Sequence, residues 1–316
     1  MKKILGIACA AMMGAAAYAD ADITNPENDA SAEVAASEWS YEPGDGIYFG
    51  EQQVVYAELA VGMDSKYMNY GFCDNKDPIL TAEAYVTFFD WLSVGFSTIF
   101  DMTHYGLKAG YANYAWNCNE FHPYLSIAHE FSPEDYDWLP TKVAFEIWYD
   151  YEYQPRGKWL TGGDRMSDTQ FWNLKIELPD LWIAPEFWYE RDVMRDNGTY
   201  LELKLKHSFA LIDDEESEDE DADPILAIIP SIAQGFGNSQ RVEAYAGIDK
   251  AGLTGTCLRC DLKWQVCDNV SLGCYVAYWD FWFDRKIREA ARDYEASGVI
   301  DSSYNFLCGL SVNVAF

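Results

Sequence analysis

The strongest constraint on the fold is a strict alternation of apolar and polar residues that recurs along the chain. Between residues 199 and 211, apolar residues of one parity alternate with polar residues of the other: Leu201, Leu203, Leu205, Phe209 and Leu211 against Glu202, Lys204, Lys206 and Ser208. Successive side chains of a β-strand point to opposite faces, whereas a helix would spread these charges around its circumference. The stretches 143–153 and 256–266 repeat the pattern. We therefore predict an all-β fold.

The same pattern, followed along the whole chain, predicts about twelve strands, near 53–64, 79–88, 92–103, 122–131, 142–153, 170–178, 181–193, 199–211, 225–235, 256–266, 271–283 and 304–316. This number is even, and each strand is close to the length of about 9–11 residues that crosses a bilayer at a tilt. Long connections would lie at one end and mostly short turns at the other. The sequence thus predicts a transmembrane antiparallel up-and-down β-barrel over residues 48–316.

Two local predictions test this interpretation. A two-residue turn at Pro179-Asp180 would pair Leu178 with Leu181 and Ile176 with Ile183, which places their apolar faces together. The strand at 225–235 is the weakest of the set, because Pro230 lacks an N–H group and argues against a central position in a sheet.

The N-terminal segment predicts export across a membrane. Lys2 and Lys3 precede a short apolar stretch that ends in Ala17-Tyr18-Ala19, the pattern of a cleaved signal peptide at residues 1–19. Residues 20–47 carry eight acids and no base, so we expect an acidic linker there. A second acidic run, at 213–223, is expected to be a solvated turn between two strands.

The net charge narrows the class of protein. The 52 Asp and Glu residues against 22 Lys and Arg give −30, which would repel nucleic acid. No apolar run of 18 or more residues follows the signal, so the sequence offers no candidate transmembrane helix. With 16% aromatic residues, the chain is also too apolar for a disordered acidic protein.

The C-terminal segment predicts the membrane in which the protein lies. Apolar residues of one parity run from Tyr304 to the terminal Phe316 and alternate with polar residues of the other parity. A last strand of this kind resembles the signal read by the barrel-assembly machinery of Gram-negative bacteria. We therefore expect a protein in the lipid of the cell outer membrane, with a secreted soluble β-sandwich as the alternative. Aromatic girdles at the membrane interfaces would explain the aromatic content.

Several segments resemble the TorF-type porin family. The stretch 59–71 (LAVGMDSKYMNYG) is similar to the family's opening strand and loop, and 185–192 (PEFWYERD) and 198–208 (GTYLELKLKHS) are similar as well. Asn69-Tyr70 stands where the family usually has an arginine before the first-loop glycine. The resemblance covers most of the chain loosely and implies an outer-membrane barrel with a porin function.

Motifs for other chemistry are weak, and we predict that the chain is not an enzyme and needs no cofactor or metal. Cys257 and Cys260 form a CxxC pair, but residues three apart in a strand face opposite sides. Cys73 and Cys118 fall in the first and second long connections, where a disulfide is plausible in an oxidising compartment. A barrel hydrolase is a third alternative; it would need a serine and a histidine that meet on the outer face.

The polar parity of the strands is where we expect function. It predicts that the lumen is lined by Glu58, Glu83, Asp101, Glu130, Glu146, Asp150, Lys175, Glu177, Glu186, Glu190, Glu202, Lys204, Arg259, Asp261 and Lys263. Because acids outnumber bases, such a pore would favour small cationic or polar solutes. The alternative is a closed structural or surface-interaction barrel, since twelve strands enclose a space that side chains can fill.

Overall fold

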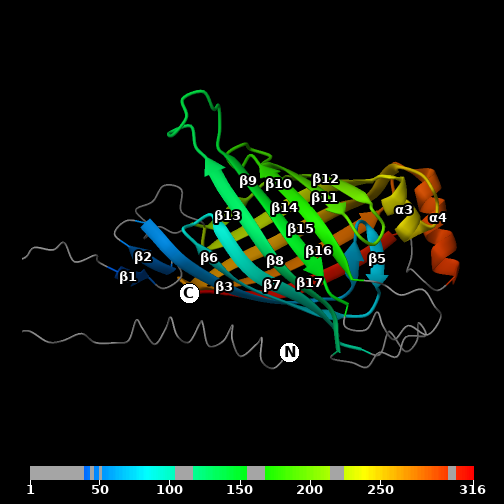
Figure 1. Ribbon diagram of the computed structural model, residues 1–316, viewed down its shortest axis with the longest axis horizontal. Coiled ribbons are helices and arrows are strands. Elements are labelled where there is room, and N and C mark those ends of the chain that lie inside the picture. The colour runs from blue at the N-terminus through cyan, green and yellow to red at the C-terminus, as the bar shows by residue number, and fades with distance from the viewer. Residues whose placement is uncertain are drawn as a thin grey trace, which may run out of the picture.

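Twelve antiparallel strands form a closed ring in the computed structural model (Figure 1). The structure describes residues 39–42, 46–49, 52–103, 117–154, 168–213, 224–297 and 304–316. In chain order the ring consists of β3 (Gln52–Asp64), β6 (Ile79–Phe88), β7 (Leu92–Asp101), β8 (Asn117–Phe131), β9 (Val143–Glu152), β10 (Thr169–Glu177), β11 (Pro185–Asp192), β12 (Thr199–Lys206), β14 (Leu226–Gly237), β15 (Gly252–Cys267), β16 (Val270–Asp280) and β17 (Tyr304–Ala315). Pairing of β17 with β3, and of β3 with β6, closes the ring. The predicted all-β barrel is confirmed.

The two ends of the barrel differ in their connections. At the turn end lie the short connections β6–β7 and β15–β16, the C-terminal residue, and the strands β1 (Trp39–Glu42), β2 (Gly46–Phe49) and β13 (Phe209–Ile212). At the loop end lie the hairpin of β4 (Tyr67–Asn69) and β5 (Phe72–Asn75) and the helices α3 (Ser239–Ala246) and α4 (Arg285–Ser297) (Figure 1). Neither helix in the described part of the chain is long and apolar enough to cross a membrane.

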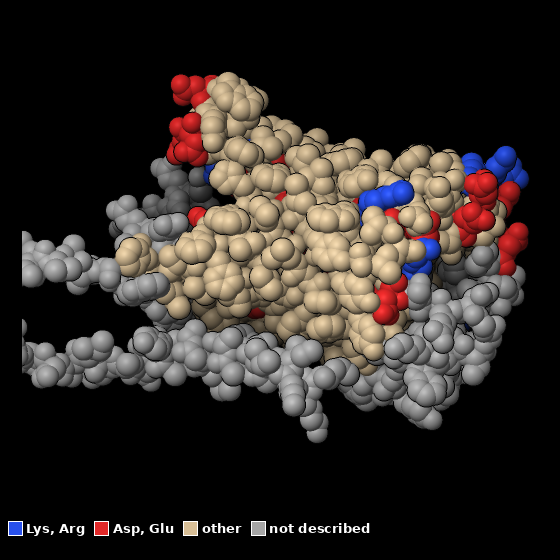
Figure 2. Space-filling model, viewed as in Figure 1, with Lys and Arg blue, Asp and Glu red and all other residues tan. Residues whose placement is uncertain are grey.

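The outer face of the barrel is apolar. On β3, Val61 and Met63 are exposed, and the same holds for Ile147 on β9 and Leu203 on β12. The side of the barrel shown in Figure 2 is almost free of charge between its two ends, where acidic and basic residues gather. The period-two pattern therefore sorts the side chains as the sequence predicts, with the apolar parity outside and the polar parity inside.

The predicted register of the β10–β11 hairpin is wrong. Ile176 pairs with Phe187 rather than Ile183, and the turn runs from 178 to 184. Backbone bonds from Leu181 to Leu178 and from Ala184 to Leu181 close this turn. The shift is four residues, an even number, so the side chains within β10 and β11 keep their predicted faces.

The prediction that Pro230 argues against a central strand position is also wrong. Pro230 lies inside β14, which has a neighbouring strand on each side, and it pairs with Cys260 of β15. Its carbonyl accepts a hydrogen bond from His207, so its nitrogen faces the gap between β12 and β13, where the neighbouring ladder is interrupted. The missing N–H group therefore costs no ladder hydrogen bond.

The N-terminal predictions are tested only in part. Strand β1 and the first half of β2 fall within the segment expected to be an acidic linker. There β1 pairs with β2, and β2 pairs with β3. The predicted signal at 1–19 and residues 214–223 of the acidic run lie outside the described residues. The division into signal, linker and barrel stays a prediction.

The first turn of α4 is capped by Asp284. Its carboxylate accepts hydrogen bonds from the backbone N–H groups of Lys286 (3.1 Å) and Ile287 (3.2 Å) and a further one from Lys250. Burial would raise the pKa of Asp284, but these hydrogen bonds hold it below its usual value. The carboxylate therefore stabilises α4 at pH values above the pKa that Asp284 has in the unfolded chain. This contribution is lost as the pH falls through the lower pKa that Asp284 has in the folded chain.

We expect Asp284→Ala to destabilise α4 by about 0.5–2 kcal/mol, because two N-terminal N–H groups lose their acceptor. Faster amide hydrogen exchange in residues 285–297 at neutral pH is the measurement. Asp284→Asn is the matched control and should exchange almost as slowly as the wild type, since asparagine also caps helices. Equal protection in all three proteins would contradict the assignment.

Candidate functional site

The β4–β5 hairpin crosses the interior of the barrel at its loop end. The hairpin leaves the wall at β3 and returns at β6, which are neighbours in the ring. Its tip reaches β11, which lies six strands from β3 in either direction around the ring. The hairpin therefore spans the lumen from one wall to the opposite one. We call the β4–β5 hairpin together with α3 and α4 the plug.

Tyr70 at the hairpin tip makes the contact with the far wall. Its hydroxyl donates a hydrogen bond to Glu190 on β11, and its ring lies 4.9 Å from the ring of Tyr200 on β12. All three side chains are buried. Burial raises the pKa of Tyr70 far above its usual value, with the Glu190 charge adding to the effect, so this phenol is neutral and acts as a donor.

Gly71 allows the close approach of the tip to the wall. The residue has φ +88°, and a Cβ at this position would lie 2.4 Å from the backbone nitrogen of Gly255 on β15. Only glycine adopts this backbone conformation without strain and leaves room for a second main chain. The tip is thus fitted between β11, β12 and β15.

Arg241 on α3 joins the hairpin tip to the wall. Its guanidinium lies 3.0 Å from a Glu190 oxygen and 3.4 Å from an oxygen of Asp196, which follows β11. The same group lies 4.2 Å from the centroid of the Tyr70 ring, a cation–π contact. Burial by itself would lower the pKa of Arg241, but Tyr70 and the carboxylates raise it above its usual value. Arg241 is therefore a buried cation, with only 1% of its side chain exposed.

An apolar core holds the rest of the plug. Ile287, Ala290 and Ala291 form the buried face of α4, and Val242 and Ala246 form that of α3. Both faces pack with Phe72 of the hairpin and with Phe281, whose rings lie 5.0 Å apart. The three parts of the plug thus share one core, which is continuous with Tyr70 and Tyr200.

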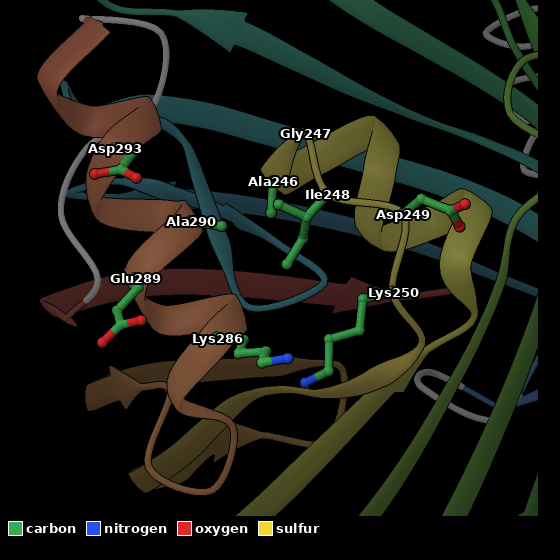
Figure 3. Close-up of a pocket in the computed structure, with 9 residues that line it drawn as sticks. All are labelled: Ala246, Gly247, Ile248, Asp249, Lys250, Lys286, Glu289, Ala290 and Asp293. Atoms are coloured by element: carbon green, nitrogen blue, oxygen red, sulfur yellow. The ribbon is translucent and has the colours of Figure 1, made fainter.

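The outer surface of the plug carries a hollow of about 610 Å³ between the two helices (Figure 3). Its lining combines the apolar residues Ala246, Ile248 and Ala290 with a rim of three acids and two bases. Lys250 and Lys286 approach each other there, and Lys250 is already paired with Asp284. Because opposite charges share the rim, the hollow shows no preference for one kind of ion.

The fifteen residues predicted to line the lumen follow the inner parity of the strands. Several acids among them accept hydrogen bonds from hydroxyl groups. Tyr56 (2.9 Å) and Tyr85 (2.7 Å) donate to Glu58, and Tyr124 donates to Glu83 (2.8 Å). Ser126 donates to Glu146 and Tyr200 donates to Glu202 in the same way, as Tyr70 does to Glu190. Asp101 instead accepts from Asn75 of the hairpin.

A row of ion pairs crosses four adjacent strands on the inner face. Lys175 lies 3.1 Å from Glu146 and 3.7 Å from Glu177, and Lys206 continues the row 2.5 Å from Glu177. Glu186 then receives both Lys206 (3.3 Å) and Lys204 (3.5 Å). The structure therefore brings together predicted lumen residues from β9, β10, β11 and β12.

Two further groups complete the inner wall. Arg259 pairs with Asp261 (2.6 Å) and lies 3.6 Å from the ring centroid of Tyr275. His122 sits between Asp150 (3.4 Å) and Glu120 (3.3 Å). The other predicted residues, Glu130 and Lys263, lie at the turn end of β8 and β15, with Lys142 3.8 Å from Glu130.

Exposure of the inner side chains changes along the barrel axis. Toward the turn end, Lys175 and Lys206 are 34% and 31% exposed, and Glu130 is 51% exposed. At the plug, Glu190 is 6% exposed. The inner charges toward the turn end are thus accessible to solvent, whereas those at the plug are buried, and we call the space lined by the accessible charges the vestibule.

The described residues do not assemble a metal site. No cluster of three or more His, Cys, Asp or Glu side chains there is arranged to hold a metal. Cys257 is buried on the inner parity and Cys260 has the outer parity, as expected of a strand. His122 lies inside the barrel rather than on the outer face where a barrel hydrolase was expected to need it, and His104 lies outside the described residues.

Sequence reasoning missed the plug, because it treated 64–78, 236–255 and 284–303 as plain connections. A signal was present in the last of them. Ile287, Ala290 and Ala291 follow the helical i, i+3, i+4 spacing, and Arg285 and Glu289 form an i, i+4 ion pair. Nothing comparable marked Tyr70 and Arg241, whose contacts depend on tertiary structure.

Comparisons with known proteins find similarity to solved structures only, and at low scores. No family model matches the chain, so the TorF-type resemblance is not confirmed, and no curated protein matches it. The COG4313 outer membrane channel of Pseudomonas putida F1 is similar in structure, with a TM-score of 0.45 and 8% identity over 83% of this chain and 96% of that one. Salmonella typhi OmpF gives a TM-score of 0.34 and 8% identity over 88% and 100% of the two chains. Acinetobacter baumannii OccAB2 gives 0.35 and 9% over 81% and 59%. Likenesses this low say nothing about function.

We expect Gly71→Ala to weaken docking of the hairpin by about 1–3 kcal/mol, because the added methyl group meets the backbone of β15. Hydrogen exchange in residues 67–75 should accelerate. Gly62→Ala on β3 is the control, since its Cβ would crowd the side-chain oxygen of Thr81, which can rotate away, and would lie at an ordinary contact distance of 3.5 Å from the backbone oxygen of Leu310. If the two variants are equally protected, the close approach of Gly71 to Gly255 does not hold the hairpin.

The predicted Cys73–Cys118 disulfide stays a prediction. Cys73 lies buried in β5, and Cys118 lies in β8 rather than in a connection, because β8 begins earlier than predicted. Peptide mass mapping of unreduced protein from an oxidising compartment should yield a linked Cys73–Cys118 peptide. Recovery of both cysteines as alkylated thiols would refute the pairing.

Proposed function

We propose that this protein is an outer-membrane channel for the passive passage of small polar or cationic solutes. The acidic, solvent-accessible vestibule is the observation that carries this proposal. A barrel built only as a scaffold has no need to keep its inner charges in contact with water. The resemblance of the sequence to TorF-type porins agrees with this proposal.

Two belts of aromatic side chains support a membrane location. Trp91, Trp182 and Trp264 are exposed near the turn end, and Phe283 and Phe306 are exposed near the loop end. Aromatic side chains of this kind favour the two interfaces of a bilayer, while the apolar outer face between them suits its hydrocarbon core. A water-soluble barrel would have to expose this whole surface to solvent.

The C-terminal strand supports assembly into the outer membrane. Phe316 exchanges backbone hydrogen bonds with Ala57, so the ladder that closes the barrel extends to the last residue. We propose that barrel-assembly machinery recognises this strand through Phe316, and that a cleaved signal delivers the chain to it.

The charge of the inner wall supports a preference for cations. The fifteen predicted lumen residues comprise eleven acids and four bases. The bases are interspersed among the acids, and Glu58 and Glu83 accept hydrogen bonds from tyrosine hydroxyl groups. A low-dielectric wall focuses such an excess of negative charge and raises the local concentration of cations.

The plug favours a second candidate function, a closed barrel whose outer surface binds a partner. Its buried core spans the loop end, which would block passage if the plug never moves. Conductance separates the two functions, since only a channel carries current.

We expect single-channel currents in planar bilayers that contain the purified full-length barrel. In a potassium chloride gradient, the reversal potential should be displaced from zero toward the equilibrium potential of potassium rather than that of chloride. Replacing Glu58 and Glu83 by glutamine should shift it toward zero, because two carboxylates leave the wall. Glu289→Gln, on the outer surface of α4, should leave it unchanged. A folded barrel that carries no current under any voltage would reject the channel.

A further inference from the structure

The contacts of the hairpin tip suggest how the lumen opens. They include a hydrogen bond from Tyr70 to Glu190, the approach of Gly71 to Gly255 and a 3.2 Å hydrogen bond from Asn69 to Tyr245. The hairpin has its own antiparallel pairing and is connected to the barrel through β3 and β6. Release of these tip contacts would therefore detach the tip from the far wall without breaking the ladder of the barrel, while Asn75 at the base of the hairpin stays bonded to Asp101.

We propose that Arg241 is the latch that holds the hairpin across the lumen, and that its release opens the loop end of the channel. This inference rests on the proposed channel function. Arg241 is suited to the role because it contacts three separate parts of the molecule at once. It belongs to α3, it pairs with Glu190 of the wall and Asp196 after it, and it lies against the Tyr70 ring of the hairpin.

The closed state depends on one cation, the guanidinium of Arg241, in the cluster that it forms with Tyr70, Glu190 and Asp196. Glu190 and Asp196 are both buried, with 6% and 8% of their side chains exposed, and Arg241 faces both of them. Without the guanidinium, two carboxylates would remain in a site shielded from water. Such charges attract water or dissolved cations, and hydration of the site is incompatible with the packed tip.

Substitution can separate the contribution of the hydrogen bond from Tyr70 to Glu190 from that of the Arg241 guanidinium. Tyr70→Phe removes the hydrogen bond to Glu190 but keeps the ring over the guanidinium. Arg241→Met removes the charge and the cation–π contact while keeping an unbranched side chain. The second change should therefore release the hairpin more completely than the first.

The experiment combines hydrogen exchange with single-channel recording on the full-length barrel. Exchange in residues 67–75 should accelerate about tenfold or more in Arg241→Met, and by a smaller factor in Tyr70→Phe. The open probability should rise in the same order. Arg285→Met is the matched control, because Arg285 is 89% exposed on α4 and pairs only with Glu289 among the described residues. It should match the wild type in both measurements.

The outcomes separate the latch from the channel. Unchanged exchange in Arg241→Met would overturn the latch, whatever the currents show. Faster exchange with an unchanged open probability would show that the hairpin is released without gating, which also overturns the inference but leaves the channel standing. Faster exchange without current in any protein would reject the channel itself. If Arg241→Met does not fold, the double variant Glu190→Gln/Arg241→Met removes one stranded carboxylate and is held to the same outcomes.

Discussion

Closure of the β-sheet is the constraint on which the rest of the structure depends. Pairing of β17 with β3 leaves the ring of twelve strands without a free edge, so every strand has one face outside and one inside. Polar side chains are then confined to an enclosed space in which each charge needs a partner or water. The chain meets this requirement in two ways, with a solvent-accessible vestibule at one end and a buried, charge-paired plug at the other.

The strands could be predicted from sequence because their signal is local. An alternation of period two fixes the face of each side chain even where the partner is misassigned, and the β10–β11 hairpin shows this. Its register differs from the prediction by an even number of residues, and Ile176 still points outward, where it is exposed. Pro230 shows the limit of such reasoning, because its position depends on an interruption in the neighbouring strand that no single segment reveals.

The plug could not be predicted, because its stability comes from contacts between distant segments. Tyr70, Glu190 and Arg241 are far apart in sequence, and only closure of the ring brings the hairpin tip opposite β11. The aromatic residues were assigned to the lipid interfaces as a group. Several of them, including Phe72 and Tyr200, instead form the interior core. Composition counts aromatic side chains but does not distinguish a girdle from a core.

The composition of the plug bears on why a charged cluster is present at all. Burial of an ion pair generally stabilises a protein no more than apolar packing of the same volume does, because both charges lose their hydration. The contacts of α4 show that this chain can build an apolar core at the same end, with Ile287 and Ala291 fully buried. Charge is instead concentrated where the hairpin meets the far wall, around Arg241. A contact that must hold permanently would gain from apolar residues there. A contact that must open to water favours groups that water can solvate once they separate, and the cluster consists of such groups.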